Sequence, residues 1–403
     1  MREDILTTEL QKVSSESQRR ELYSMDWLDD KDKIIEGAFA ECYLKMHPMI
    51  CIHGILFTID GIVSDESGIK NDIYSMVRPY VTSGLARKVE QLLQTIKLEA
   101  YSEPLPLQTD RIHVANGTLF LNGEFSEQKD FCLNRLPVIY DPDVEKPARW
   151  LKFMEELLNP DDILTLQEYM GYMLLPTTKA QKMMLIIGKG GEGKSRIGLV
   201  LRELFGNNMY SCSLQKIEVD KFARANLEYM LITVDDDMKL EALPQTNHIK
   251  SIVTLEDQID LERKGQQSFQ GVVYARLIAF GNGGLHALYD KTDGFYRRQL
   301  ILTTKDKVDG REDDPYLIDK LRKERDGIFL WALEGLQRLV SNNYVFTESV
   351  DAKQNLVDAQ EEGNNILAFM KSEGYLQFEI GKKISSTDFY NIYVSWCEDN
   401  LEK

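Results

Sequence analysis

The chain of 403 residues contains 48 Lys and Arg against 65 Asp and Glu, a formal net charge of −17, and 43% of its residues are hydrophobic. This composition is typical of a soluble globular protein with two or three domains. The acidic balance argues against a protein that coats nucleic acid with its whole surface. It does not exclude a ring that grips DNA only through loops in a central channel, where local charge decides.

The cysteines and the apolar runs indicate the compartment. The five cysteines form no C-x-x-C pair, so the sequence predicts neither a zinc site nor a disulfide framework. The longest apolar run, near residues 49–63, is interrupted by His53 and Asp60, and no segment has the succession of a secretion signal. We therefore expect a cytoplasmic protein that has no membrane partner.

The first 109 residues carry no chemical motif. Apolar residues at helical spacing predict helices within residues 1–48 and 71–100, and residues 50–63 between them look extended. The apolar positions are Ile5, Leu6, Leu10 and Val13 in the first stretch and Val89, Leu92, Leu93 and Ile96 in the last. We assign this part of the chain, residues 1–109, to an N-terminal α+β region of unknown role.

Residues 110–178 combine a β segment with a helical stretch. Two turn pairs, Asn116-Gly117 and Asn122-Gly123, separate short apolar runs and predict a β-hairpin. A linker marked by two prolines then leads into a helical stretch over residues 149–175. We expect a β-hairpin and a helical collar ahead of the next domain.

The chain is organised around residues 183–195. The apolar run Met183–Ile187 predicts a buried strand, and the next eight residues, GKGGEGKS, match the P-loop pattern G-x-x-x-x-G-K-[ST]. Helical spacing after the loop predicts a helix that ends at Gly206. This strand-loop-helix context distinguishes a phosphate-binding loop from a glycine-rich turn, which is the ordinary alternative.

The chemistry of the loop predicts an ATP and Mg²⁺ site. Glycines let successive backbone N–H groups face a phosphate chain at the N-terminus of a helix, which also favours anions. Lys194 would reach the β and γ phosphates, and the Ser195 hydroxyl would hold Mg²⁺. The predicted site comprises Gly188, Gly190, Gly191, Glu192, Gly193, Lys194, Ser195 and Arg196. A P-loop alone indicates only a nucleoside triphosphate, since kinases, GTPases and motors share it.

Three consecutive carboxylates follow another apolar run. Leu231–Val234 predicts a strand that delivers Asp235, Asp236 and Asp237 at its end. Adjacent carboxylates repel one another and a cation offsets the repulsion, so we expect a Walker B site; a solvated acidic turn is the alternative. Strand alternation permits Asp235 and Asp237 on one side and Asp236 on the other, so the carboxylate that polarises water stays open.

Two later strands also end in candidate groups. The run Leu277–Phe280 leads to Asn282, whose amide could orient the attacking water or contact the γ phosphate. Arg297 and Arg298 precede the run Leu300–Thr303, and in an ATPase one of them could neutralise charge on a neighbouring subunit's γ phosphate. A turn-forming Asn and ordinary surface charge are the alternatives.

Residues 249–274 separate the second strand from the third. Apolar runs flank the segment Glu262–Gly265, which predicts a β-hairpin with a cationic tip. Arg263 and Lys264 are therefore candidates for contact with a DNA phosphate, although charged tips are common in soluble proteins.

The C-terminal part, residues 311–403, is predicted to be helical. Helices are expected over residues 315–342, 365–372 and 387–400, and a short β segment is expected at residues 375–380.

In this order the features resemble the superfamily 3 helicases, in particular the phage, plasmid and poxvirus-type primase-helicases. The resemblance runs from about residue 110 to residue 400. The segments that carry it are LQEYMGYMLL (Leu166–Leu175), GKGGEGKS, VDDD, IKSIVTLEDQIDLERKG (Ile249–Gly265), AFGN (Ala279–Asn282), FYRR (Phe295–Arg298), DGIFLWALEGL (Asp326–Leu336) and YNIYVSWCEDN (Tyr390–Asn400). The last segment is similar to the start of the family's C-terminal winged-helix region. The primase domain common upstream in this family has no evident counterpart here.

The resemblance implies an α/β fold with an AAA+ type P-loop ATPase core over residues 179–310. Such cores form hexameric rings with ATP between subunits, and the core would be followed by a partial winged helix within residues 311–403. By the same resemblance, Lys194 and Ser195 bind phosphate and Mg²⁺, Asp235 and Asp236 form Walker B, Asn282 is sensor 1, Arg297 or Arg298 is the finger in trans, and Lys264 contacts single-stranded DNA.

We therefore expect an ATP-dependent DNA helicase that acts as a homo-hexamer on single-stranded and forked DNA. The family usually translocates 3′ to 5′, and this protein would serve replication of a phage, plasmid or mobile element in the cytoplasm of a bacterial host, with a separate primase or polymerase. Two other functions stay open: a non-unwinding AAA+ initiator or loader, and a P-loop kinase of a small molecule. The kinase explains the P-loop but not Asn282, the arginine pair or Lys264.

Overall fold

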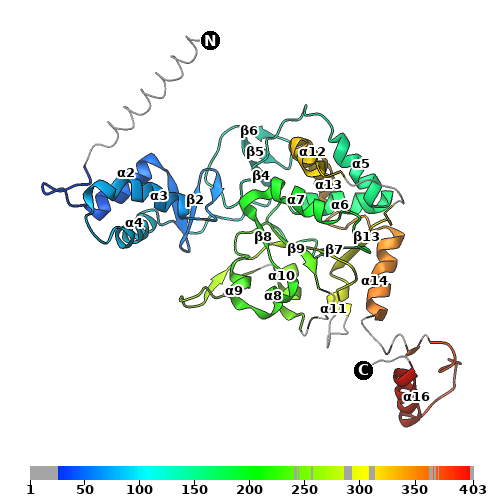
Figure 1. The fold of residues 1–403 in the computed structure, drawn as a ribbon. Coiled ribbons are helices and arrows are strands. Elements are labelled where there is room, and N and C mark those ends of the chain that lie inside the picture. The colour runs from blue at the N-terminus through cyan, green and yellow to red at the C-terminus, as the bar shows by residue number, and fades with distance from the viewer. Residues whose placement is uncertain are drawn as a thin grey trace. The chain divides into compact units, whose positions relative to one another are not determined.

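The chain forms two compact units, Met1–Leu105 with Asp130–Cys132 and Pro106–Lys129 with Leu133–Lys403 (Figure 1). This computed structural model describes residues 26–239, 243, 245–255, 257–285, 293–307, 314–362, 366, 369–370 and 372–399. The predicted positions Ile5, Leu6, Leu10 and Val13 and half of the predicted helix 365–372 lie outside these ranges. None of the helices in the described ranges combines the length and the apolar character that crossing a bilayer would require.

The first unit is a small α+β body. Its antiparallel sheet has the order β1-β2-β3, and the two-residue turn between β1 and β2, His53-Gly54, has φ of 49° and 78° at its two positions, as a tight hairpin turn requires. The predicted buried face of α4 is confirmed, because Val89, Leu92, Leu93 and Ile96 are all buried. The elements are α2 (Glu36–Met46), β1 (Met49–Ile52), β2 (Ile55–Thr58), β3 (Gly61–Ile62), α3 (Ser67–Val77) and α4 (Leu85–Glu99).

The second unit is built on a parallel five-stranded sheet of order β13-β7-β12-β9-β8. The predicted α/β architecture with a parallel sheet is therefore confirmed. The P-loop strand β7 and the acidic strand β9 are not neighbours, because β12 lies between them. The strands are β7 (Met183–Ile187), β8 (Met209–Ser211), β9 (Ile232–Met238), β12 (Arg276–Gly281) and β13 (Gln299–Thr303).

Helices cover both faces of this sheet, as a parallel sheet requires (Figure 1). Alternate residues of β7 face opposite sides, so that Met184 and Ile186 join one apolar cluster and Met183 and Leu185 join the other. The first cluster is completed by α6 (Pro160–Tyr172), α7 (Ser195–Phe205) and α13 (Arg325–Ser341), and the second by α8 (Leu214–Val219), α10 (Asn247–Thr254) and α11 (Asp293–Tyr296).

The predicted β-hairpin ahead of the core is a three-stranded antiparallel sheet of β4 (Arg111–Val114), β5 (Gly117–Phe120) and β6 (Phe125–Ser126). The helical stretch 149–175 is two helices, α5 (Ala148–Leu157) and α6, since Pro160 starts a new helix at its first position. The stretch 315–342 is likewise two helices, α12 (Leu317–Lys323) and α13. The remaining elements are α9 (Lys221–Ala225), β10 (Ile259–Leu261), β11 (Phe269–Gly271), α14 (Val350–Glu362), α16 (Ser386–Asp399) and two short 3-10 turns, Arg78–Tyr80 and Gly206–Asn208.

Two expectations for the C-terminal part are corrected. The segment 375–380 is not a strand; its apolar side chains Phe378 and Ile380 are exposed, and the structure pairs them with no neighbouring strand. Helix α14 was not predicted, and it packs against the edge strand β13, where the Asn355 side-chain amide donates to the Ile301 carbonyl at 3.0 Å. This bond uses part of the exposed edge that a sheet must protect.

Helices α6 and α13 approach so closely that glycine is required at their contact. A Cβ on Gly335 would stand 2.8 Å from the Glu168 backbone nitrogen and closer still to the Gln167 carbonyl. A Cβ on Gly171 would likewise meet the backbone of α13 at Leu336. The same interface carries an ion pair, in which Arg338 Nε donates to the buried Glu168 carboxylate at 2.6 Å. The close contact and the ion pair therefore fix α6 and α13 against each other, and both helices contribute to the first apolar cluster.

We predict that Gly335→Ala destabilises the second unit by about 1–3 kcal/mol, because backbone atoms cannot give way as a flexible side chain can. The midpoint of thermal unfolding of the full chain measures the loss. The matched control is Gly68→Ala in α3, where no described atom lies within 4 Å of the new Cβ. There alanine should be neutral or stabilising by up to about 1 kcal/mol. Equal effects of the two substitutions would contradict the close approach.

Candidate nucleotide site and hairpin

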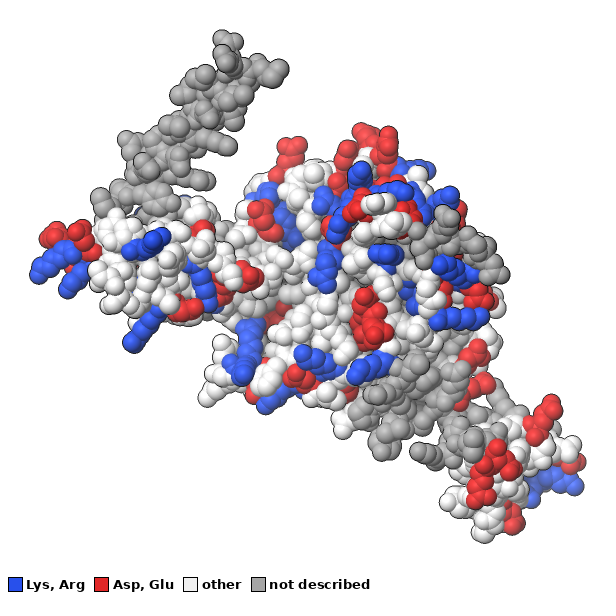
Figure 2. Space-filling view, viewed as in Figure 1, with Lys and Arg blue, Asp and Glu red and all other residues white. Residues whose placement is uncertain are grey.

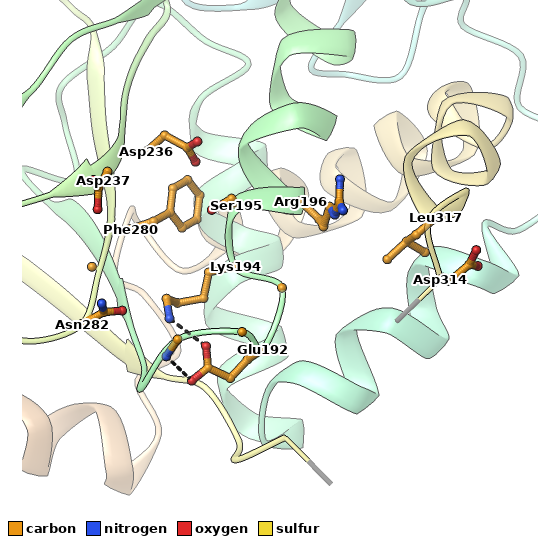
Figure 3. A pocket seen from close by; sticks show the side chains of 14 residues that line it. Glu192, Lys194, Ser195, Arg196, Asp236, Asp237, Phe280, Asn282, Asp314 and Leu317 are labelled. Carbon is orange, nitrogen blue, oxygen red and sulfur yellow. Dashed lines mark hydrogen bonds and ion pairs between the residues drawn. The ribbon is translucent and has the colours of Figure 1, made fainter. Parts of the chain in front are cut away.

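A pocket of about 340 Å³ lies at the carboxyl ends of β7, β9 and β12 (Figure 3). Ligands bind at this edge of open α/β sheets, and the volume lies within the roughly 300–1,000 Å³ of small-molecule sites. Its lining residues are Gly190, Gly191, Glu192, Gly193, Lys194, Ser195, Arg196, Asp236, Asp237, Phe280, Gly281, Asn282, Asp314 and Leu317. The structure thus brings together most of the residues that were predicted separately along the chain.

The loop has the backbone conformation that its glycines permit. Gly190, Gly191 and Gly193 have φ of 109°, 83° and 109°, a region that other residues rarely adopt. Gly188 is required for a different reason, since a Cβ there would stand 3.0 Å from Lys194 Nζ and would overlap the Thr304 hydroxyl. Among the eight predicted loop residues, Gly188 alone does not line the pocket.

Ser195 and Asp236 form the part of the site that suits a metal ion. Ser195 and Asp236 both line the pocket, and the Asp236 side chain points toward Ser195 (Figure 3). Partial burial and the neighbouring Asp237 carboxylate raise the pKa of Asp236, which the nearby Ser195 hydroxyl lowers only in part. A hydroxyl and a carboxylate are hard oxygen ligands, which Mg²⁺ prefers. The residues present therefore fit the magnesium ion that a P-loop site uses.

Asp235 differs from the two aspartates that follow it. Its side chain is buried at 4% exposure and accepts a hydrogen bond from the Leu214 backbone N–H at 2.9 Å, at the start of α8. Burial raises the pKa of this carboxyl. Asp235 does not line the pocket, whereas Asp236 and Asp237 both do. The predicted pairing of Asp235 with Asp236 at a metal ion stays a prediction, and the carboxylates that the pocket itself brings together are Asp236 and Asp237.

The reason is an irregularity in strand pairing. Ala279 of β12 pairs with Asp235, but Gly281 pairs with Met238, so β9 contains one extra residue at this point. Such a bulge breaks the alternation of side chains. Asp236 and Asp237 consequently both face outward from the sheet, where strict alternation would have separated them.

Asn282 lies at the edge of the pocket. It follows β12, the strand between the P-loop strand and the acidic strand, and its exposed side chain lines the pocket. In Figure 3 Asn282 lies beside the loop and below Asp237, while Asp236 points toward Ser195. The polar groups of three strands thus converge from separate parts of the sequence.

Glu192 was predicted as part of the loop, but its contacts were not. Its Oε1 accepts from the Gly190 N–H at 2.7 Å and its Oε2 pairs with Lys194 Nζ at 2.9 Å. Burial pushes the pKa of Glu192 up, but the hydrogen bonds from Lys194 and the backbone outweigh it and hold this pKa below its ordinary value. Asp314 and Leu317 close the opposite side of the pocket, and no motif marks them because they lie beyond the last strand.

The predicted cationic hairpin exists, with β10 and β11 paired antiparallel. Its two basic residues have different environments. Lys264 is exposed in the connecting loop. Arg263 forms an ion pair with the fully buried Glu228 carboxylate, and its guanidinium lies 4.8 Å from the centroid of the Phe269 ring. Arg263 therefore anchors the hairpin, and Lys264 is the residue that the structure presents to a ligand.

The two arginines before β13 also differ. Arg298 donates to the Gly294 carbonyl within its own turn. Arg297 is exposed, and in the part of the chain that the structure describes no acceptor lies within hydrogen-bond distance of its guanidinium. Neither arginine lines the pocket of its own chain. Of the pair, Arg297 is thus the one whose side chain can reach another molecule.

Comparisons with known proteins extend this description. Residues 186–298 match a family described as "Family of unknown function (DUF5906)". Two structures of the NrS-1 C-terminal region superimpose with TM-scores of 0.55 and 0.52, at 12% and 11% identity. They cover 91% and 89% of this chain and 86% and 84% of their own.

The chain shares the fold of the NrS-1 C-terminal region. A structure of JCV helicase matches 56% of this chain and 61% of its own, at 14% identity. Its TM-score of 0.28 is too low to indicate a shared fold. At these identities the likeness concerns the fold, so the roles of individual residues depend on the geometry described above.

We predict different outcomes for the three aspartates. Asp236→Asn should lower Mg²⁺-dependent ATP hydrolysis about 100-fold or more, since the charged metal ligand is lost. Asp235→Asn should leave hydrolysis near the wild-type rate, because asparagine still accepts from the Leu214 N–H. Asp237→Asn should permit nucleotide binding and slow hydrolysis. Steady-state turnover at varied Mg²⁺ separates them; loss of activity in Asp235→Asn with normal activity in Asp236→Asn would reverse our assignment.

Proposed function

We propose that this protein is an ATP-dependent DNA helicase with a superfamily 3, AAA+ type core. The observation that carries the proposal is the convergence of the P-loop, Asp236 with Ser195, and Asn282 on one pocket, in a chain that also presents Lys264 on a hairpin inserted between two strands of the same sheet. A small-molecule kinase needs the pocket but has no use for such a hairpin.

The chain's own groups supply the chemistry of hydrolysis. Lys194 neutralises the β and γ phosphates, and the N–H groups of the loop and of the start of α7 orient them. Ser195 and Asp236 would hold Mg²⁺, and Asp237 and Asn282, which line the same pocket, would orient the attacking water. Bound ATP supplies the phosphoanhydride bond whose cleavage drives the motor.

The hairpin is tied to the nucleotide site in two ways. Along the chain, β11 leads directly into β12, the strand that carries Asn282. In space, Arg263, which lies in the hairpin loop beside Lys264, pairs with Glu228, which lies just before the acidic strand β9. A shift of β9 or β12 during hydrolysis would therefore move Lys264, which supports a motor in which ATP turnover displaces a DNA contact.

Surface charge is compatible with a local DNA contact. Figure 2 shows Lys and Arg mixed with Asp and Glu over the visible face, in keeping with the net charge of −17. A protein of this kind binds DNA through a few placed cations. We further propose, on the resemblance to superfamily 3 helicases, a hexameric ring with 3′ to 5′ translocation in the replication of a phage, plasmid or mobile element, together with a separate primase or polymerase.

The decisive experiment is unwinding of a labelled forked duplex with ATP and Mg²⁺, with ATP turnover measured in parallel with and without single-stranded DNA. A helicase requires both stimulation and strand separation. Stimulated turnover without strand separation would indicate an initiator or loader, and turnover indifferent to DNA would indicate a phosphotransferase.

We predict that Lys264→Ala reduces unwinding and DNA affinity while basal ATP hydrolysis survives. Each lost phosphate contact should lower the slope of log affinity against log salt by about 1. The matched control is Lys152→Ala, which removes an exposed lysine on α5 away from hairpin and pocket and should change neither quantity. Equal DNA binding by the two variants would mean that Lys264 does not contact DNA.

We also predict that Arg297→Ala retains ATP binding but loses hydrolysis by a factor of about 10³ to 10⁵, the range of arginine fingers. Because the finger acts in trans, mixing Arg297→Ala with Lys194→Ala subunits should restore turnover at interfaces that combine an intact P-loop with an intact arginine. Turnover is measured after subunit exchange has been verified with labelled subunits. No recovery in such mixtures would contradict a finger that serves the neighbouring subunit.

A further inference from the structure

The Glu192 carboxylate occupies the donors that the P-loop offers to an anion. Its two oxygens take the Gly190 backbone N–H at 2.7 Å and the Lys194 ammonium at 2.9 Å (Figure 3). Glu192 and Lys194 are 3% and 8% exposed, so this ion pair is shielded from water. The inference below rests on the nucleotide-binding part of the proposed function.

The same donors cannot serve the carboxylate and a phosphate together. A P-loop binds phosphate through its loop N–H groups and its lysine, and Glu192 here holds the lysine and one of those N–H groups, that of Gly190. A carboxylate left in place beside an incoming phosphate chain would also add like-charge repulsion in a partly dry site. The nucleotide must therefore displace the Glu192 side chain before Lys194 can reach its phosphates.

The loop has room for this displacement. Glu192 stands between two glycines with positive φ, Gly191 and Gly193, and a glycine backbone is less restricted than that of other residues. No described atom lies within 4 Å of the point where a Cβ on Gly190 or Gly191 would stand, so the outer side of the loop is open. Lys189, which is 81% exposed, offers a positive charge to the Glu192 carboxylate once that carboxylate has left the Gly190 N–H and Lys194.

We propose that Glu192 is an internal competitor of the nucleotide phosphates and thereby sets the affinity of the site. Each binding event exchanges the Glu192–Lys194 pair for a phosphate–Lys194 pair, and each release event restores it. The exchange lowers the affinity for ATP and for ADP alike, because both present a β phosphate to the loop. It also keeps the Lys194 charge neutralised when product departs, which favours fast exchange of ADP for ATP in a motor that must cycle.

The test is equilibrium binding of ATP, ADP and adenosine to the full-length protein with Mg²⁺ and without DNA. Glu192→Gln, close in shape but uncharged, should tighten ATP and ADP about tenfold or more, the worth of a charge-assisted hydrogen bond. Adenosine should bind wild type and variant equally. Glu192→Ala should shift the affinities in the same direction, so the result does not depend on hydrogen bonds made by glutamine.

The matched control is Asp306→Asn. Asp306 is another acidic residue beside the loop. Its carboxylate pairs with the exposed Lys189 at 2.8 Å and not with Lys194 or the loop N–H groups. Removing this charge should change ATP affinity by less than about threefold, because exposed ion pairs contribute little. A gain in Asp306→Asn equal to that in Glu192→Gln would mean that bulk charge sets the affinity, and would overturn the competitor role.

Two results separate this proposal from the helicase assignment. If Glu192→Gln and Glu192→Ala, folded as judged by an unchanged unfolding temperature, bind ATP no tighter than wild type, Glu192 organises the loop and the competitor role is wrong, whatever the unwinding assay shows. If they bind ATP tighter while neither they nor wild type unwind forked DNA, the competitor role stands and the helicase assignment fails.

Discussion

The position of β12 between β7 and β9 is the constraint on which the site depends. Parallel strands end at one edge of a sheet, so this order delivers the P-loop, Asn282 and the carboxylates of β9 side by side. It also leaves the P-loop strand with a neighbour on each side, because β13 pairs along its other edge from Met183 to Ile187. The loop is consequently held on a strand that cannot shift independently of the sheet.

Electrostatics then determines how the site works. Asp236 and Asp237 stand together at the pocket, and partial burial raises the pKa of Asp236. That arrangement is costly unless a cation is bound, which is why the carboxylates and the Ser195 hydroxyl suit Mg²⁺. On the other side of the pocket Lys194 and Glu192 neutralise each other. The charge of Lys194 is therefore neutralised within the site by Glu192, whereas the charges of Asp236 and Asp237 require a metal ion.

Local patterns in the sequence predicted the parts of the fold that local physics determines. The strand Met183–Ile187, the loop after it and the turn pairs of the β4–β6 sheet depend on side-chain periodicity and on glycine, and all were predicted. The parts that failed depend on distant partners. The outward position of Asp237 depends on a bulge against β12, and the ion pair that holds Arg263 depends on Glu228, 35 residues away. Neither of these two contacts leaves a mark in the local sequence pattern, so a single sequence could not reveal them.

A buried polar network extends these distant contacts from the hairpin to the far end of the P-loop helix. Glu228, which anchors Arg263, is followed by Tyr229, and the Tyr229 carbonyl accepts from the Asn134 side chain at 2.7 Å. Asn134 in turn donates to Asn208 at 3.0 Å, and Asn208 donates to the Phe205 carbonyl at the end of α7 at 2.9 Å.

Satisfied buried networks of this kind rigidify their surroundings, because each group left unpaired would cost about 1–3 kcal/mol. The network therefore links the hairpin loop at Arg263 to the end of α7. The helix that begins at the phosphate site and the loop that carries Lys264 must then move together, which is the mechanical property that a nucleotide-driven DNA contact requires.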